Sequence, residues 1–385
     1  MANRESNKKP VLLQILPSLY SGGVERGTVE IAVAAAKEGF TSIVASSGGT
    51  MVPMLEAEGV THIKLPLASK NPLMMFYNSI RLSFIIRKRK VNILHARSRA
   101  PAWAARMAFK GKRCRFITTF HGVYGVKGPL KKSYNRVMTK GDKIIAISNF
   151  VADHIVENYG IDRSKIEVIH RGVDLIEFDP ERITKEDKRK QELQWKPQKY
   201  LPIILLPGRI TRWKGHDFLL KALAEIPHHD YTCVFLGDDK HHNQYKIELL
   251  EEIERLKLRG NVTMMPNTPN MPLAYAMADL VVSASTQPEA FGRVAVEAQA
   301  MGRMVIATNH GGSAETIVNG KTGFLVSPTD PKEMAAMIEK VLKMQEKDKL
   351  VIATNARKHV QKNFSSKQMS DRTLVLYNQL LEGEE

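Results

Sequence analysis

The chain has 385 residues, of which 43% are hydrophobic and 25% are charged, and its formal net charge is +17. A chain of this length is too long for a single hydrophobic core, which predicts two domains. The composition is typical of a globular α/β protein. The sequence shows no internal repeat and no low-complexity tract, which excludes repeat architectures. Cys114 and Cys233 lie far apart without metal-ligand spacing, which predicts a reducing compartment and no disulfide framework.

The first half of the chain alternates between strand and helix patterns. The apolar run 11–16 follows a polar terminus and precedes Pro17; it is too short for a membrane span, so we expect a first strand rather than a signal peptide. The alternation that follows predicts a parallel sheet with right-handed crossovers. The expected strands are 11–16, 42–45, 92–95, 116–119, 143–147 and 166–169, and the clearest helices are 29–38 and 150–158.

The second half repeats this pattern after a charged stretch, residues 181–199, that we expect to contain the passage between domains. A last helix is predicted over 365–381, beginning with a Ser-Ser cap. The predicted fold class is therefore α/β, with two Rossmann-like, doubly wound parallel-sheet domains at 1–185 and 186–362 and a C-terminal segment at 363–385. The strands expected in the second domain are 203–206, 233–237, 262–265, 280–283, 304–308 and 324–326.

A glycine pair, Gly22 and Gly23, lies in the loop that leads from the first strand into a helix. Paired glycines allow a close backbone approach to a ligand, although a plain tight turn explains them about as well. Glu25 follows in the same loop and has two interpretations. It could orient a hydroxyl group of a ligand, or it could stabilise the helix N-terminus as an anion.

A second loop with candidate ligand-binding residues follows the apolar strand 203–206 and contains Arg209 and Lys214. Ligands of doubly wound sheets bind beyond the carboxyl ends of the strands. Arg209 offers a fork for bidentate phosphate contacts, and Lys214 offers a mobile point charge. Either residue alone would be a solvated basic loop, but together they suit a diphosphate.

Two glutamates, Glu289 and Glu297, flank a third strand-to-helix turn. We expect Glu289 in the loop and Glu297 on the early helix. Phe291 and Gly292 lie between them, where backbone N–H groups at a helix N-terminus can bind an anion such as phosphate.

Taken in order, these motifs resemble those of the family-4 retaining glycosyltransferases. That family has the GT-B architecture of two facing Rossmann-like domains with an inter-domain cleft, and the similarity covers nearly the whole chain. The chain departs from the family pattern at Arg171, where Asn-Gly is common, and at Met304, where a proline is frequent. The motifs that carry the resemblance are Ser21 to Glu25, His121-Gly122, Ala146 to Asn149, Gly172 to Asp174, Gly208-Arg209 with Lys214-Gly215, Gly237-Asp238, Glu289 to Glu297, and Gly311-Gly312 with Glu315.

The resemblance implies a role for each site residue. Glu289 would bind hydroxyls of the donor sugar and Glu297 the ribose, while His121, after the strand 116–119, would contact the donor sugar. The glycine loop would face the donor diphosphate. Family members retain the anomeric configuration, which implies front-face attack by the acceptor on an oxocarbenium-like centre.

Chemically, a sugar nucleotide already carries an activated bond, so the protein mainly has to stabilise the departing diphosphate. Arg209, Lys214 and helix N–H groups would supply that charge without a metal. A glycosidase-like pair of carboxylates is rejected, because Glu297 is expected beside the phosphate-binding cations. Asp238 and Asp239 have no third ligand nearby, so a turn is favoured over a metal site.

The net charge is concentrated in one stretch. Residues 59–141 contain nineteen Lys or Arg and no Asp or Glu, whereas the rest of the chain holds 57 − 19 = 38 basic and 40 acidic residues. Within it, apolar residues recur at helical spacing, and we expect this stripe to pack on the sheet of its own domain. The stripe consists of Leu73, Phe76, Tyr77, Ile80 and Phe84 and is followed by Arg87 to Lys90.

Packing of the stripe does not explain why residues 59–141 contain no Asp or Glu. Anionic lipids attract polybasic surfaces, and nucleic acid would bind the same charges, but the sequence lacks zinc-finger spacing, an RNP-type strand and a Gly-Arg-rich arm. We therefore expect a cytoplasmic enzyme, peripheral on the inner membrane, that uses a UDP- or GDP-sugar and a lipid-linked or anionic glycan acceptor such as lipopolysaccharide core. The alternatives are a nucleotide-sugar epimerase or hydrolase of the same architecture and a non-enzymatic basic membrane- or nucleic-acid-binding protein.

Overall fold

The structure is a computed structural model that describes residues 9–383 except 21, 110–113, 126–127, 196, 199–200 and 239–242. It divides into two compact units. The first contains residues up to Gly172 together with the segment from Ser366 onward, and the second contains Val173–Ser365.

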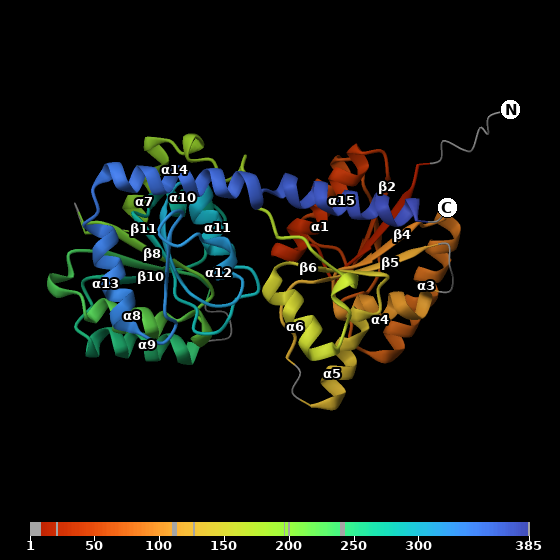
Figure 1. The fold of residues 1–385 in the computed structure, drawn as a ribbon, viewed down its shortest axis with the longest axis horizontal. Coiled ribbons are helices and arrows are strands. Elements are labelled where there is room, and N and C mark those ends of the chain that lie inside the picture. The colour runs from red at the N-terminus through yellow and green to blue at the C-terminus, as the bar shows by residue number, and fades with distance from the viewer. Residues whose placement is uncertain are drawn as a thin grey trace. The chain divides into compact units, whose positions relative to one another are not determined.

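The first unit is built on a seven-stranded sheet whose strands pair in parallel in the order β3-β2-β1-β4-β5-β6-β7. Alternate strand residues, among them Leu12, Ile93 and Ile117, form a core with α1 and α15, so these two helices cover one face of the sheet (Figure 1). The strands are β1 (Val11–Ile15), β2 (Thr41–Ser46), β3 (Thr61–Lys64), β4 (Ile93–Ala96), β5 (Arg115–Phe120), β6 (Lys143–Ala146) and β7 (Ile166–Val168).

Two helices of this unit, α3 (Pro72–Arg89) and α6 (Asn149–Tyr159), begin at residues whose side chains accept a hydrogen bond from the first turn. Asn71 caps α3 by accepting from the Leu73 N–H, and Ser148 caps α6 by accepting from the Val151 N–H. Gly160 ends α6 in the left-handed conformation. The helices are α1 (Gly23–Lys37), α2 (Val52–Ala57), α3 (Pro72–Arg89), α4 (Arg99–Ala108), α5 (Pro129–Asn135), α6 (Asn149–Tyr159) and α15 (Ser366–Glu382), with short 3₁₀ turns at Arg136–Thr139 and Arg163–Lys165.

The expected packing of the apolar stripe on α3 is wrong. Leu73, Phe76 and Ile80 are 80%, 60% and 56% exposed. The helix instead turns Met75, Leu82 and Ile85 inward and packs against α4. The small and polar residues Asn78 and Ser79 complete its buried face, so the hydrophobic pattern alone indicates the wrong side.

The second unit has a six-stranded parallel sheet in the order β10-β9-β8-β11-β12-β13. Side chains such as Ile204, Phe235 and Val282 form its largest described core with α8, α9 and α13. The strands are β8 (Ile203–Pro207), β9 (Thr232–Leu236), β10 (Val262–Met265), β11 (Leu280–Ser283), β12 (Met304–Thr308) and β13 (Phe324–Val326).

Its helices alternate with these strands along the chain, as right-handed crossovers require. They are α7 (Lys185–Trp195), α8 (His216–Ala224), α9 (Asn243–Arg255), α10 (Met271–Met277), α11 (Arg293–Ala300), α12 (Ser313–Thr316), α13 (Pro331–Leu342) and α14 (Glu346–Asn363), with 3₁₀ turns at Pro180–Arg182, Arg212–Lys214 and Pro227–His229. The expected fold class, two doubly wound parallel sheets, is confirmed.

The segment before α7 belongs to the second unit, although residues 173–185 were expected in the first domain. The Val173 N–H donates to the Phe364 carbonyl oxygen, and the Phe178 ring packs on Tyr275. The last helix belongs to the first unit, where α15 packs against α1.

Each sheet has a point where the strand order reverses. In the first unit it lies between β1 and β4, and in the second between β8 and β11. Loops at the carboxyl ends of the two strands diverge there and leave a crevice in which doubly wound sheets bind ligands. The candidate residues that follow β1, β8 and β11 therefore lie at the carboxyl edge of their sheets, as expected.

Candidate functional site

In the second unit, the loop after β8 positions Lys214. This loop turns through the 3₁₀ segment Arg212–Lys214 and ends at Gly215, whose φ is 74°. A Cβ on Gly215 would lie 1.8 Å from the Ala284 carbonyl oxygen, so only glycine allows this loop to approach the loop after β11 so closely. The Thr286 N–H also donates to the Trp213 carbonyl oxygen at 2.8 Å and holds the two loops together.

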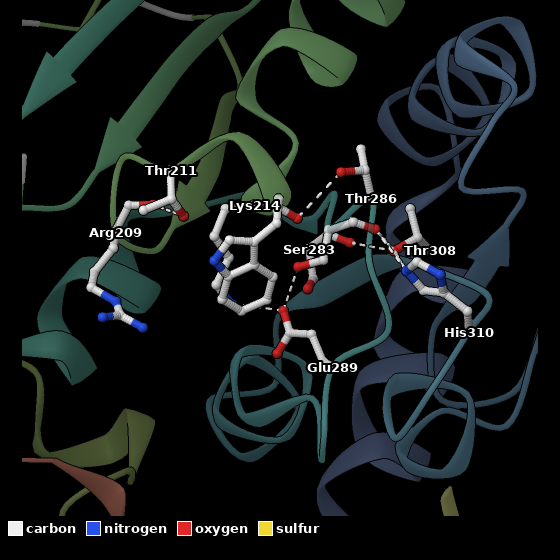
Figure 2. A network of polar contacts seen from close by, with 10 residues as sticks. Arg209, Thr211, Lys214, Ser283, Thr286, Glu289, Thr308 and His310 are labelled. Atoms are coloured by element: carbon white, nitrogen blue, oxygen red, sulfur yellow. Dashed lines mark hydrogen bonds and ion pairs between the residues drawn. The ribbon is translucent and has the colours of Figure 1, made fainter. Parts of the chain in front are cut away.

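Lys214 and Glu289 form an ion pair across the strand-order reversal. Lys214 Nζ lies 2.7 Å from Glu289 Oε1, and the side chains are 14% and 9% exposed. The same oxygen accepts from Ser285 Oγ, while Lys214 Nζ also lies 4.4 Å from the Trp213 ring centroid. Figure 2 shows the Lys214 and Glu289 side chains converging from the loops after β8 and β11. Charged groups held this way in a dry site interact strongly with a bound ligand.

The backbone of Glu289 is fixed by the loop after β12. Its carbonyl oxygen accepts from the Gly312 N–H at 2.7 Å, and it forms a parallel bridge with Gly311. A Cβ on Gly311 would lie 2.5 Å from that carbonyl oxygen, which explains why a glycine is required there. In the same network Thr308 Oγ1 and His310 Nε2 both approach the Ser285 carbonyl oxygen at 2.7 Å.

Glu297 lies on α11 as expected, but it already has protein partners. Its carboxylate accepts from Tyr275 Oη at 2.8 Å and pairs with Arg293. Burial, followed by the charge of Glu297, raises the pKa of Tyr275 well above its usual value, so the phenol stays protonated and keeps donating. Gly292 is the N-cap of α11 in the left-handed conformation, and the preceding Phe291 ring is buried against Phe364.

Arg209 extends from the same loop as Lys214 but is exposed. In Figure 2 its guanidinium lies apart from the Glu289 carboxylate, and no interaction is drawn between them. The second unit thus places one buried cation, one exposed cation and one carboxylate around the end of β8. Such an arrangement can bind phosphates on one side and hydroxyl groups on the other.

The first unit contains a separate pocket at the carboxyl ends of its own strands. Gly23 and Gly27 of α1 lie on one side, and Arg97, His121 and Arg171, which follow β4, β5 and β7, lie on the other. The lining is completed by Ile31, Thr119, Ile145, Ile147, Ile169, Met369 and Thr373. The pocket therefore combines the hydrogen-bond donors Arg97, His121 and Arg171 with apolar lining residues, beside the N-terminus of α1.

His121 in this pocket is neutral. Burial, followed by the charges of Arg171 and Arg97, lowers its pKa well below 6.5. Arg171 Nη2 lies 2.9 Å from His121 Nδ1; because a guanidinium can only donate, Nδ1 accepts and the proton is on Nε2. Nε2 is buried without a hydrogen-bond partner among the described residues, so it can donate to a ligand in the pocket.

Arg97 is a site residue that the sequence analysis missed. It is only 3% exposed, its Nη1 donates to Gln14 Oε1 at 3.3 Å, and its Nε has no partner among the described residues. Burial lowers the pKa of its guanidinium to about 10. The available signal was an arginine directly after a buried strand at the same sheet edge as the glycine loop.

The glycine loop itself is partly described, because Ser21 lies outside the described residues. Gly22 is the N-cap of α1 with a φ of 134°, and a Cβ there would lie 2.5 Å from Glu25 Oε2. The Glu25 carboxylate therefore folds back toward the first turn of α1, where an anion is favoured. Gly27 leaves room for Arg97, whose Nη2 would be 3.3 Å from an added Cβ.

His95, on β4, is completely buried. Its Nδ1 lies 2.6 Å from Tyr377 Oη and its Nε2 lies 2.7 Å from Thr119 Oγ1. It thus connects β4 and β5 to α15, and burial lowers its pKa well below 6.5. Its role is structural.

Two features are absent from the described residues. No group of three or more His, Cys, Asp or Glu side chains is arranged to hold a metal ion in that part of the chain; Asp239, one of two aspartates considered for such a role, lies outside it. Across the same residues no helix is long and apolar enough to cross a membrane.

Two Rossmann-like units, each with candidate ligand-binding residues at the point of strand reversal, define the GT-B class of glycosyltransferases. Family models match both parts of the chain: Glycosyltransferase Family 4 over residues 21–177 and Glycosyl transferases group 1 over residues 186–359. The chain belongs to the family-4, group 1 glycosyltransferases, as the sequence motifs predicted. It is therefore an enzyme that uses a nucleotide-sugar donor.

The similarity to solved structures covers almost the whole chain. A glycosyltransferase from Rickettsia africae ESF-5 is 42% identical, with 97% of this chain and 99% of that one covered and a TM-score of 0.89. The Anabaena protein HepE, solved in complex with UDP and glucose, is 22% identical, with 96% and 100% covered and a TM-score of 0.81. This second likeness shows the fold alone.

Among curated relatives, the D-inositol 3-phosphate glycosyltransferase of Segniliparus rotundus is 33% identical over 218 residues. The match covers 55% of this chain and 47% of that protein. The chain thus spans about half the length of this relative.

Proposed function

We propose that the protein is a retaining, metal-independent glycosyltransferase that moves a sugar from a UDP- or GDP-sugar to a lipid-linked or anionic glycan, such as a lipopolysaccharide core. The observation that carries the donor half of this proposal is the buried Lys214–Glu289 pair at the strand reversal of the second unit. A cation and a carboxylate in one dry site suit a substrate whose diphosphate and sugar hydroxyls are neighbours.

In this proposal Lys214 and Arg209 bind the diphosphate and stabilise the negative charge that develops as it leaves. Backbone groups around Phe291 and Gly292, at the N-terminus of α11, contribute a partial positive charge. Glu289 accepts hydrogen bonds from donor-sugar hydroxyls. Glu297, which is already oriented by Tyr275 and Arg293, binds the ribose hydroxyls.

The first unit supplies the remaining roles. His121 donates its Nε2–H to the donor sugar, and the loop at Gly22 and Gly23 contacts the diphosphate. Glu25 can orient an acceptor hydroxyl. The pocket beside them supports an anionic acceptor, because Arg97 and Arg171 line it and no carboxylate is among its lining residues. A phosphate or carboxylate would satisfy these donors.

The proposed acceptor also suggests where in the cell the enzyme works. We propose that the enzyme is cytoplasmic and works at the inner face of the membrane, where lipid-linked glycans are accessible. The support is the stretch 59–141, which has nineteen basic and no acidic residues, since anionic lipids attract such a surface.

The deciding experiment has two parts. Thermal shifts against a panel of UDP-, GDP- and other sugar nucleotides should identify one donor, and the shift should shrink in Lys214→Met. With that donor, Glu289→Gln should abolish transfer while the protein stays folded. Transfer at the wild-type rate would remove Glu289 from the site. Donor consumption without any acceptor would instead favour an epimerase or hydrolase.

A further inference from the structure

The outward face of α3 carries an apolar stripe that is exposed among the described residues of the first unit. Its members are 80%, 60%, 45%, 56% and 60% exposed, in the order Leu73, Phe76, Tyr77, Ile80 and Phe84. Leu73, Phe76, Ile80 and Phe84 follow one another at intervals of three or four residues and Tyr77 is adjacent to Phe76, so all five lie along one side of the helix. We call these five residues the α3 face. Its large aromatic and aliphatic side chains form one contiguous row, and exposed apolar patches of this kind mark interaction sites.

Cations surround the α3 face. The Arg81 guanidinium lies 6.0 Å from the Tyr77 ring centroid, and Lys88 Nζ lies 5.6 Å from the Phe84 ring centroid. The last turn of the helix adds Arg87 and Arg89. No Asp or Glu occurs between residues 59 and 141, so no carboxylate from that stretch offsets these charges.

We propose that α3 docks the protein on an anionic lipid bilayer, with the α3 face inserted among the headgroups and its cations on the lipid phosphates. An interfacial helix needs this combination of one apolar side, flanking basic residues and aromatic side chains. The helix remains attached to the fold through its other side, where Met75, Leu82 and Ile85 are buried. This proposal rests on the proposed function in that it explains how a lipid-linked acceptor is reached.

Charge distinguishes the bilayer from the main alternative, a second copy of this chain. A symmetric dimer through the α3 face would bring the two basic stretches toward each other. Like charges opposed across an interface weaken it. An anionic surface has the opposite sign and gains from each Lys or Arg near it.

The test is sedimentation of the full chain with vesicles of phosphatidylcholine alone or mixed equally with phosphatidylglycerol, at low salt. The wild type should sediment with the mixed vesicles only. Phe76→Ser combined with Phe84→Ser should weaken this binding by about ten-fold or more, because each inserted aromatic ring contributes buried apolar area. Replacing Arg87 and Arg89 with Glu should also weaken it and should reduce its dependence on salt.

The matched control is Leu350→Ser with Val351→Ser on α14, where the side chains are 68% and 59% exposed in the second unit. It removes a similar exposed area and should leave vesicle binding unchanged. Equal binding by the Phe76/Phe84 variant and the wild type would overturn the proposal, as would wild-type binding to phosphatidylcholine alone. A Phe76/Phe84 variant that only changes the oligomeric state in light scattering would assign the α3 face to a second copy.

Donor binding, measured on the same proteins by thermal shift, separates this inference from the proposed function. If the Phe76/Phe84 variant loses vesicle binding but keeps the thermal shift with the nucleotide sugar, the result supports membrane docking through α3. Vesicle binding that depends on α3 in a protein without any nucleotide-sugar shift would contradict the proposed donor and leave the docking surface standing.

Discussion

Lys214 Nζ and Glu289 Oε1 lie 2.7 Å apart although the two residues are 75 positions apart in the sequence. The pair exists because β8 and β11 are neighbours in the sheet and their loops diverge at the strand reversal. Both side chains are almost completely buried, so each charge depends on the other for compensation.

The first prediction concerns the stability of this pair. Glu289→Ala should lower the free energy of unfolding by about 3 kcal/mol, because it leaves the Lys214 ammonium buried without its carboxylate. Glu289→Gln should cost less, since the amide oxygen can still accept from Lys214 and Ser285. Thermal unfolding of both variants without ligand measures the difference. Equal losses would mean that the carboxylate charge accounts for the whole effect and that packing and the hydrogen bonds to the retained oxygen contribute nothing.

Gly215 provides a second prediction, on the geometry of the Lys214 loop. Gly215→Ala should cost several kcal/mol and lower donor affinity, because the new Cβ would meet the Ala284 carbonyl oxygen. Gly320 is a matched control in the same unit, with the same φ of 74° and no atom within 4 Å of an added Cβ. Gly320→Ala should cost only about 1 kcal/mol from backbone strain. Similar unfolding temperatures for the two variants would contradict the steric argument.

The sequence allowed most of the fold to be predicted, because buried parallel strands are continuous apolar runs. β3, Thr61–Lys64, escaped because it is an edge strand without such a run, and its residues are exposed or half-buried. The side of α3 that packs inward was also mispredicted. A pattern of apolar residues identifies one face of a helix, but it cannot tell whether that face meets the core or a partner.

The site could be predicted only where the chain supplies local motifs. Glu289, Lys214 and the glycine loop lie in loops that follow strands, and Glu297 lies on the helix that follows the Glu289 loop. Arg97 has no motif of its own; its importance comes from burial beside His121 and Arg171, which requires the sheet order. The structural role of His95 follows from Tyr377, which is 282 residues away in the sequence.

The third prediction concerns pH. His95 and His121 both have a lowered pKa in the folded chain, so below about pH 6.5 the unfolded chain binds protons that the folded chain does not. The free energy of unfolding should therefore fall as the pH drops from about 7 to about 5, by up to about 1.4 kcal/mol per pH unit for each histidine. Urea unfolding at several pH values measures this slope.

His121→Gln should reduce that slope, because one of the two histidines that bind a proton only on unfolding is removed. The control His228→Gln should keep the wild-type slope, because His228 is exposed. If the slope in His121→Gln matched that of the wild type, the pKa of His121 would not be lowered in the folded chain, and the assignment of a neutral ring whose Nδ1 accepts from Arg171 would be contradicted.

The fourth prediction concerns Arg171, where this chain departs from the Asn-Gly pattern of its family. Arg171→Asn removes the guanidinium that donates to His121 Nδ1 and that helps to lower the pKa of His121. The pKa of the imidazole should therefore rise, and NMR titration of His121 should detect the change.

If the pocket of the first unit binds an anionic acceptor, the same variant should raise the acceptor KM by about ten-fold or more, because one charge-assisted contact is lost. The KM for the donor should change much less, since Lys214 and Glu289 are untouched. Arg171→Lys separates charge from geometry: it keeps the positive charge but loses the planar fork, so it should restore part of the acceptor affinity. An acceptor KM unchanged in Arg171→Asn would show that the acceptor carries no anionic group at this position, and Arg171 would then serve only to orient His121.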